Sequence, residues 1–236
     1  MNMYSVILLV AGTGSRMGLG YNKALYQISG KTIAEHSAQV FLNDERCRQI
    51  MLVTSEADAN QMKALFSGEA KVEFVIGGDT RQESVCKGLE YVKEEIVLVH
   101  DGARPFITQE MITGCYEVAK AGEGALLAVP VKDTIKKMDS ENDTLVSHTL
   151  DRSELMSAQT PQSAPTHVLR LAHGRAKVER FIGTDEAHLI EKYTDTKVKV
   201  VQGGHMNLKF TTPEDIAYFE YVMMQSNLSF KDRADG

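Results

Sequence analysis

The sequence has little cysteine. Its three residues, Cys47, Cys86 and Cys115, lie far apart, and no Cys-x-x-Cys pair occurs. An odd number of widely spaced cysteines does not indicate a disulfide framework. Their spacing also differs from that of the paired cysteines in a zinc site. We therefore expect the three cysteines to be buried and to pack as small hydrophobic residues in a reducing compartment. We predict a cytoplasmic location.

A long apolar run is also missing. The run from Val6 to Ala11 is far shorter than the roughly 20 residues that a membrane helix requires. The N-terminus has no basic region or cleavage site of a signal peptide, so the glycosylation triplets at Asn142 and Asn227 carry no meaning. We expect no membrane partner.

Positive charge is not in excess. Asp plus Glu total 32 against 26 for Lys plus Arg, which gives a net charge of −6 with histidine neutral. An acidic chain argues against a nucleic-acid partner, although a local basic pocket stays compatible with it. A hydrophobic share of 43% over 236 residues suffices for one sizeable core.

What the sequence does contain is an alternation of β-branched runs and helical patterns. Strands are predicted at 5–11, 49–54, 72–76, 96–100 and 125–131, and helices at 32–42, 57–66, 80–92 and 108–120. This order predicts a Rossmann-like α/β fold, with a mostly parallel twisted sheet and helices on both faces. Such sheets bind ligands beyond the carboxyl ends of their strands.

The pattern changes after residue 131. Runs at 134–138 and 145–150 predict a protruding antiparallel β-arm, too small to bury its own core, that packs elsewhere or on another subunit. Then follow predicted helices near 166–177 and 185–192, strands near 198–202 and 206–210, and a helix from Thr212. We expect a single domain at 1–226, with the arm at about 134–156, and a polar tail at 227–236.

A glycine-rich loop, AGTGSRMG, follows the first strand. A dinucleotide fingerprint fits poorly, because Met17 takes the place of its third glycine. The acid after the second strand also lies about twice as far along as the fingerprint requires. A P-loop ending at Gly30-Lys31-Thr32 fails because its first glycine falls on Leu25, so a turn at Gly30 and a helix cap at Thr32 explain that stretch.

A third interpretation of this loop is a polyphosphate site. Gly12 and Gly14 let backbone N–H groups approach phosphate oxygens, and Arg16 and Lys23 can contact a polyphosphate from two sides. Transfer at an α-phosphate develops negative charge that such cations stabilise. A solvated surface loop is the alternative.

Polar groups also follow the third strand, in GGDTRQES at 77–84. Its glycines permit close backbone approach, Asp79 and Ser84 suit a base edge, and Arg81 adds positive charge. A turn with a helix cap is the structural alternative.

The fourth strand leads into HDGARPF at 100–106. Asp101 suits Mg²⁺ and Arg104 suits a second anion, with mutual pairing of the two as the alternative. His100 is expected to be a packed strand residue. Cations and hydroxyls suited to an acceptor phosphate lie at further loops: Arg104, Arg152, Lys209, Thr134, Thr160 and Thr184.

In this order the motifs resemble the 2-C-methyl-D-erythritol 4-phosphate cytidylyltransferases of the non-mevalonate isoprenoid pathway, over about residues 6–220. The motifs are AGTGSRMG with Lys23, GGDTRQESV, LVHDGARPF, PVKDTIK, LDRSEL, QTPQ, TDEA and NLKFTTPED. The resemblance implies a nucleotidyltransferase that uses CTP and Mg²⁺ or another divalent cation. The acceptor phosphate attacks the α-phosphorus, pyrophosphate leaves, and 4-diphosphocytidyl-2-C-methyl-D-erythritol forms.

The resemblance also implies roles for residues. The catalytic cations are Arg16, Lys23 and Lys209, and Asp101 serves the metal. The residues that bind CTP are Ala11, Gly12, Gly14, Gly78, Asp79, Ser84 and Gly102. The residues that bind the polyol phosphate are Arg104, Thr134, Arg152, Thr160, Thr184 and Lys209. The family forms homodimers, and Arg152 looks like the arginine contributed across the dimer through the β-arm.

Three positions depart from the family's pattern. Val10 stands in place of an alanine, Gly102 replaces the first alanine of Asp-Ala-Ala-Arg, and Met156 replaces an aromatic residue. We expect Gly102 to loosen the ribose contact. A ribitol 5-phosphate cytidylyltransferase, a non-catalytic nucleotide-binding module and an NAD-linked reductase are the alternatives. LDRSEL and TDEA favour the methylerythritol acceptor.

Overall fold

The computed structural model of the protein describes residues 3–12, 21–140, 142 and 144–222. Gly14, Arg16 and the predicted tail at 227–236 therefore lie outside the described residues. Within the described residues, no helix is both long and apolar enough to cross a membrane.

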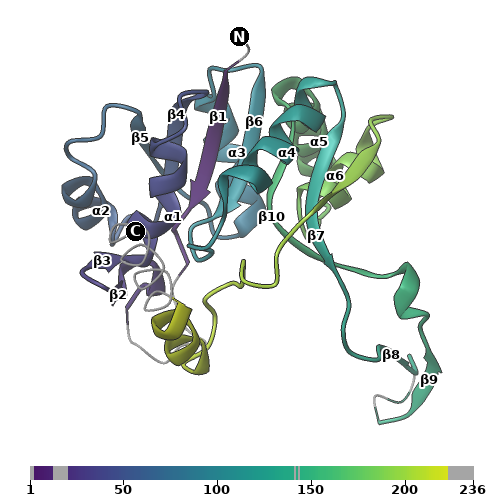
Figure 1. The fold of residues 1–236 in the computed structure, drawn as a ribbon. Helices are drawn as coiled ribbons and strands as arrows, with labels where there is room; N and C mark the ends of the chain where they lie inside the picture. Colours follow the sequence, from purple (N-terminus) through teal and green to yellow (C-terminus); the bar gives the residue numbers. More distant parts are fainter. Residues whose placement is uncertain (1–2, 13–20, 141, 143, 223–236) are drawn as a thin grey trace, which may run out of the picture.

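A seven-stranded sheet forms the centre of the molecule (Figure 1). In spatial order its strands are β11 (Val198–Gln202), β7 (Gly124–Pro130), β10 (Met156–Pro165), β6 (Ile96–Asp101), β1 (Tyr4–Leu9), β4 (Cys47–Thr54) and β5 (Val72–Ile76). Every neighbouring pair is parallel except the two pairs that β10 makes with β6 and β7. The predicted mostly parallel sheet is confirmed.

Helices cover both faces of this sheet, as predicted. One face packs against α1 (Ile33–Leu42), α2 (Ala59–Leu65) and α4 (Gln109–Lys120), and the other against α3 (Arg81–Tyr91), α5 (Thr166–Glu179) and α6 (Glu186–Tyr193). Because side chains alternate along a strand, Val6 and Leu8 of β1 point into the first layer and Ile7 into the second.

A short hairpin precedes α1. Its strands, β2 (Gln27–Ile28) and β3 (Lys31–Thr32), were not predicted, and Ser29 and Gly30 join them with φ of 52° and 81°. Two positive φ values suit a type I′ turn and explain the glycine. Thr32 forms a capping box with Glu35, so the predicted turn and helix cap are confirmed at the segment that mimics a P-loop.

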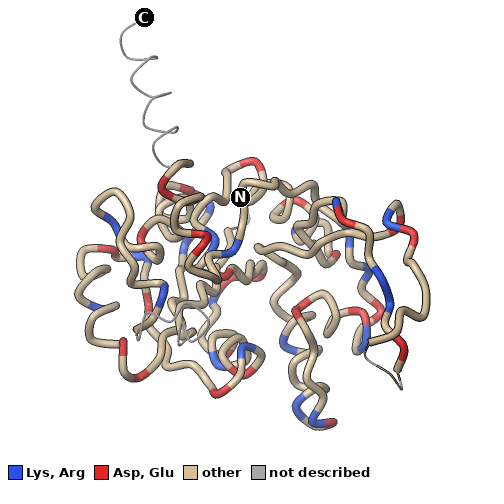
Figure 2. The backbone as a smooth tube through the Cα atoms, turned by 90° about the horizontal axis from the view of Figure 1, so that it is seen from below, with Lys and Arg blue, Asp and Glu red and all other residues tan. Residues whose placement is uncertain are grey.

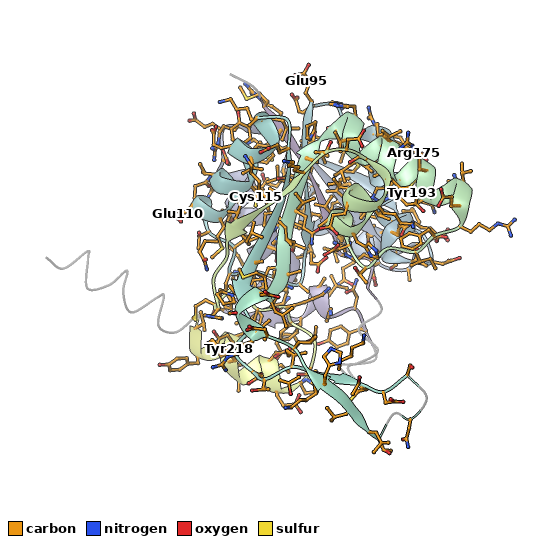
Figure 3. All side chains as sticks on the ribbon, turned by 90° about the vertical axis from the view of Figure 1, so that its right-hand side faces the viewer. Glu95, Glu110, Cys115, Arg175, Tyr193 and Tyr218 are labelled. Carbon is orange, nitrogen blue, oxygen red and sulfur yellow. The ribbon has the colours of Figure 1, made fainter. Side chains whose placement is uncertain are left out.

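The predicted β-arm is also present. β8 (Lys136–Met138) and β9 (Val146–Thr149) form their own two-stranded sheet, and all their residues are exposed. Figures 1 and 3 show the arm projecting away from the body, and a 3₁₀ turn, η3 (Arg152–Glu154), leads back to β10.

Two details of the predicted pattern are wrong. Strand β10 was missed, because its segment is polar and contains two prolines, although it lies at the centre of the sheet. The strand predicted at 206–210 does not form; the segment is irregular. Side chains and single backbone bonds hold it instead, with the Phe210 N–H donating to the Ala103 carbonyl. A helix follows at 214–222, close to the predicted start at Thr212.

The cysteines are free thiols. Cys47 and Cys115 are buried, as expected, and Figure 3 labels Cys115 in the interior. Cys86 on α3 is only half-buried.

Candidate active site

A cleft of about 370 Å³ opens at the carboxyl ends of β1, β5 and β6. The chain passes from β1 to β4 and β5 on one side and reaches β6 on the other, so the cleft lies at a topological switch point, where open α/β sheets bind ligands. Figure 2 looks from this side and shows Lys and Arg mixed with Asp and Glu. The predicted residues that line the cleft are Ala11, Gly12, Lys23, Gly78, Asp79, Ser84, Asp101 and Lys209.

Asp101 is the central acid of the cleft. It ends β6 and its side chain is only 10% exposed. One carboxylate oxygen accepts from Lys209 Nζ at 2.6 Å and the other from Arg81 Nε at 3.1 Å. Burial alone would raise the pKa of Asp101, but the charges of Arg81 and Lys209 outweigh burial and hold the pKa well below its usual range. The carboxyl is therefore an anion throughout the physiological pH range. Its ion-pair partners are Arg81 and Lys209, and not Arg104 as in the alternative interpretation.

Arg81 connects Asp101 to the layer behind it. Its Nη1 and Nη2 donate to the two oxygens of Glu186, at 2.8 and 3.0 Å, while its Nε faces Asp101. Burial disfavours the charge of Arg81, but Glu186 and Asp101 outweigh burial and raise its pKa. A planar guanidinium can serve two carboxylates at once, which a lysine cannot do with comparable geometry. Arg81 was expected to offer its charge to a ligand, and instead it orients the central acid.

The segment after β5 approaches the cleft through its backbone. A Cβ on Gly78 would lie 2.4 Å from Glu83 Cβ, so no larger residue fits there without movement. Ser84 Oγ accepts from the Gly78 N–H at 3.1 Å, and Thr80 caps α3 in a capping box with Glu83. The turn and helix cap are therefore present, and they place Gly78, Asp79 and Ser84 along the cleft.

Asn22 joins the segment before Lys23 to the residue that follows β1. Its amide nitrogen donates to the Val10 carbonyl at 2.6 Å and to Asp58 Oδ2 at 2.8 Å. Its oxygen accepts from the Ala24 N–H and caps the 3₁₀ turn η2 (Lys23–Leu25). Lys23 is thereby held at the cleft next to the end of β1.

Gly102 lies against the end of β1, outside the cleft lining. A Cβ on it would lie 2.5 Å from Val10 Cγ1 and 2.9 Å from the Leu9 carbonyl oxygen. Val10 and Gly102 are both departures from the family's pattern, one larger and one smaller than alanine. In the structure the Val10 side chain occupies the space that a side chain at residue 102 would need.

Asn207 and Arg104 support Lys209 from the side of the irregular 206–210 segment. Arg104 Nη1 donates to the Asn207 carbonyl at 2.7 Å, and the Asn207 amide donates to the Thr160 carbonyl at 3.0 Å. Burial lowers the pKa of Arg104, and its Nε has no hydrogen-bond partner among the described residues.

Thr160 contributes from within the sheet. Its Oγ1 accepts from the Asp101 backbone N–H at 3.0 Å and lies 3.1 Å from His100 Nδ1. His100 is fully buried, packs on Phe41 and has its pKa lowered to about 4, chiefly by burial. The prediction of a packed histidine is confirmed, and Thr160 holds the backbone at the acid.

The remaining predicted residues lie away from the cleft lining. Thr134 and Arg152 are exposed near the base of the arm, and Arg152 donates to the Lys132 carbonyl at 2.9 Å. Thr184 is exposed just before α6 and lies 3.3 Å from His188 Nδ1. The described part of one chain does not bring these three residues together with Lys209.

Sequence reasoning missed three supporting residues: Asn22, Glu186 and Asn207. Their partners lie far away in the sequence, 105 residues in the case of Arg81 and Glu186. Glu186 lies inside the TDEA motif, which was the only signal at that position.

Known proteins match the chain over nearly its whole length. A family model described as 2-C-methyl-D-erythritol 4-phosphate cytidylyltransferase matches residues 4–225. Proteins of that name from Bacillus velezensis and Bacillus cytotoxicus are 41% and 44% identical, over 93% and 92% of this chain and 95% and 96% of theirs.

A solved structure supports the same relationship. The crystal structure of 4-diphosphocytidyl-2C-methyl-D-erythritol synthase from Anaerococcus prevotii superposes with a TM-score of 0.84 at 28% identity, covering 94% of this chain and 96% of that one. These relatives are all named for the methylerythritol compound and none for ribitol 5-phosphate. The chain therefore belongs to the 2-C-methyl-D-erythritol 4-phosphate cytidylyltransferase family.

Proposed function

We propose that this enzyme transfers the cytidylyl group of CTP to 2-C-methyl-D-erythritol 4-phosphate and releases pyrophosphate. One observation carries the proposal: Lys23, Asp101 and Lys209, from three distant segments, line the same cleft as the backbone of Gly12 and Gly78. The family supplies the identity of the substrates.

The CTP site is proposed to run along this cleft. Gly78, Asp79 and Ser84 offer backbone and hydroxyl groups to the base, and Gly102 lies at the ribose. At the other end, Ala11, Gly12, Gly14, Arg16 and Lys23 are proposed to hold the triphosphate. N–H groups and fixed cations suit phosphate oxygens, because they stabilise the charge without reorganising during the reaction.

The chemical step is an attack of an acceptor phosphate oxygen on the α-phosphorus of CTP. The new phosphorus–oxygen bond forms as the bond to the leaving pyrophosphate breaks. Arg16, Lys23 and Lys209 are proposed to stabilise the developing negative charge. Lys209 suits this role because its ammonium, with a side chain 32% exposed, has three donors and gives only one to Asp101.

Asp101 is proposed to hold Mg²⁺ or another divalent cation. Among the described residues no three His, Cys, Asp or Glu side chains form a metal cage. Mg²⁺ is commonly held by one or two carboxylates together with substrate phosphates and waters, so one ionised carboxylate in a triphosphate cleft fits it. Bound there, the cation neutralises charge on the phosphates.

The acceptor is proposed to bind beside Lys209 and Arg104, whose positive charges suit its phosphate. Thr160 supports this site from the sheet. Thr134, Thr184 and Arg152 are proposed to complete it in a homodimer, in which Arg152 comes from the partner through the arm. Exposed apolar side chains on and beside the arm, at Met138, Leu145, Val146 and Met156, suit such an interface.

A single assay tests this function. The purified chain receives CTP, Mg²⁺ and either 2-C-methyl-D-erythritol 4-phosphate or ribitol 5-phosphate, and pyrophosphate release is measured. We expect release with the methylerythritol compound. Release with ribitol 5-phosphate alone would overturn the acceptor, and no release with either would leave a nucleotide-binding module.

A matched pair of lysine variants controls the assay. Lys209→Ala should lower kcat about a hundredfold or more, the usual cost of one charge-stabilising donor. Lys63→Ala on α2 should leave kcat unchanged, because Lys63 is exposed and does not line the cleft.

We further propose that residues 1–226 form one nucleotidyltransferase domain. The cytoplasmic location stays a prediction.

A further inference from the structure

A second cavity, of about 490 Å³, lies between α3 and α5 on the face of the sheet behind the active site. From α5 it receives His173 and Lys177, and from α3 it receives Gln82 and Cys86, four residues apart in each helix, while Arg180 lines it as the C-cap that follows α5. This spacing puts each set on one helix face. The volume is within the usual range of small-molecule sites.

His173 forms the inner end of this cavity. The residue is 2% exposed, and neither ring nitrogen has a hydrogen-bond partner among the described residues. Burial lowers the pKa of His173, so its ring is neutral, with one donor and one acceptor nitrogen. Leaving such buried groups unpaired is unfavourable, so a polar group within the cavity would be stabilising.

Two cations line the outer end. Lys177 and Arg180 make no ion pair among the described residues. By contrast, Glu83 on the facing helix is used in the cap of α3, and Lys87 donates to the Gly77 carbonyl. Glu90 of α3 also lines the cavity and makes no ion pair with either cation among the described residues, so Lys177 and Arg180 keep their charges available to a bound anion.

The middle of the cavity is apolar. Ala176 and Phe181 line it, and Ile182 lies at its edge with 72% of its surface exposed. From His173 to Glu179, the last residue of α5, is six residues of helix, or about 9 Å at 1.5 Å per residue, and Arg180 follows as the cap. An aliphatic chain of about eight carbons spans that length.

We propose that this cavity is a binding site for an aliphatic carboxylic acid with a hydroxyl at its far end. The carboxylate pairs with Lys177 and Arg180, the chain packs on Ala176 and Phe181, and the hydroxyl bonds with His173. A hydroxyl can donate to or accept from the one imidazole nitrogen that it meets, whichever tautomer the ring adopts. The cavity adjoins the cleft that holds Asp101 and Lys209, since Thr80 lines both, but the residues that the proposal uses line the cavity and not the cleft.

Cys86 makes the proposal directly testable. It lines the cavity and is half-buried, whereas Cys47 and Cys115 are buried and serve as internal controls. The rate of Cys86 alkylation by iodoacetamide is followed by mass spectrometry with 8-hydroxyoctanoate, octanoate or 1,8-octanediol, and calorimetry measures the same three affinities. If bound ligand blocks the thiol, 8-hydroxyoctanoate at ten times its Kd slows alkylation about tenfold.

The two comparison compounds separate the two ends of the site. Octanoate lacks the hydroxyl and the diol lacks the charge, so both should bind several-fold more weakly than 8-hydroxyoctanoate. Equal binding of all three, or no binding of 8-hydroxyoctanoate by either method, would overturn the proposal.

Variants test the same contacts from the protein side. His173→Phe keeps the ring shape and should weaken 8-hydroxyoctanoate about five- to tenfold without affecting octanoate. Lys177→Gln should weaken both acids but not the diol, while Lys63→Gln on α2 should change nothing. Thermal unfolding verifies that each variant is folded, and unchanged affinities in folded variants would contradict the assignment.

Discussion

Replacing Gly102 by alanine should destabilise the protein, because the new Cβ meets Val10. The Cβ would lie 2.5 Å from Val10 Cγ1, whereas carbon atoms in contact prefer about 3.5–4.0 Å. The end of β1 must therefore move by about 1 Å, and overpacking of this kind costs about 1–3 kcal/mol. Val10→Ala alone should also cost roughly 2 kcal/mol, since it removes two buried methyl groups.

The informative variant is the double one. When Val10→Ala and Gly102→Ala are combined, the closest contact is gone, and only the 2.9 Å approach to the Leu9 carbonyl remains. Urea unfolding of the four proteins should show the double variant about 1–2 kcal/mol more stable than the sum of the single effects predicts. Gly174→Ala is the control, since nothing lies within 4 Å of its Cβ and it should stabilise α5 by about 0.5–1 kcal/mol. Strictly additive losses in the free energy of unfolding would refute the idea that side chains at residues 10 and 102 compete for one space.

Three further outcomes are expected. Lys23→Ala should lower kcat far more than it weakens CTP binding, and a pure rise in KM would instead show that Lys23 binds substrate and transition state equally. Since the pKa of His100 is about 4 when folded and about 6.5 when unfolded, only the unfolded chain takes up a proton between these values. Stability should therefore fall by up to about 3 kcal/mol as pH drops from 6.5 to 4. In urea unfolding, His100→Gln should lose less stability over that range, and identical slopes would contradict the assignment. Sedimentation should show a dimer, and a monomer would leave Arg152 without its proposed role.

Local pattern predicted the frame of the fold, because most strands are continuous apolar runs between helical patterns. It failed where contacts between residues far apart in the sequence determine the local structure. β10 carries Gln159, Thr160 and Gln162 into the centre of the sheet, and its pairing with β6 and β7 overrides its poor strand composition. The 206–210 segment alternates like a strand, yet Asn207 bonds to Thr160 of β10 and Phe210 bonds to Ala103 in the loop after β6.

Residue type at strand ends predicted the main members of the cleft. Lys23, Asp101 and Lys209 are each the kind of group that a nucleotidyltransferase requires, and each of them lines the cleft. The residues that hold them in place could not be predicted. The Arg81 bridge between Asp101 and Glu186 joins side chains of α3 and α6, and no local pattern records a contact across 105 residues.

The bond made in this reaction can be followed with an isotope, because an acceptor phosphate oxygen is proposed to attack the α-phosphorus of CTP. The enzyme receives 2-C-methyl-D-erythritol 4-phosphate with heavy-oxygen-labelled phosphate, and phosphorus NMR locates the label in the products. We expect label in the bridging oxygen of the cytidine diphosphate product and none in pyrophosphate. Label in pyrophosphate, or a product whose bridging oxygen comes from CTP, would contradict the proposed attack.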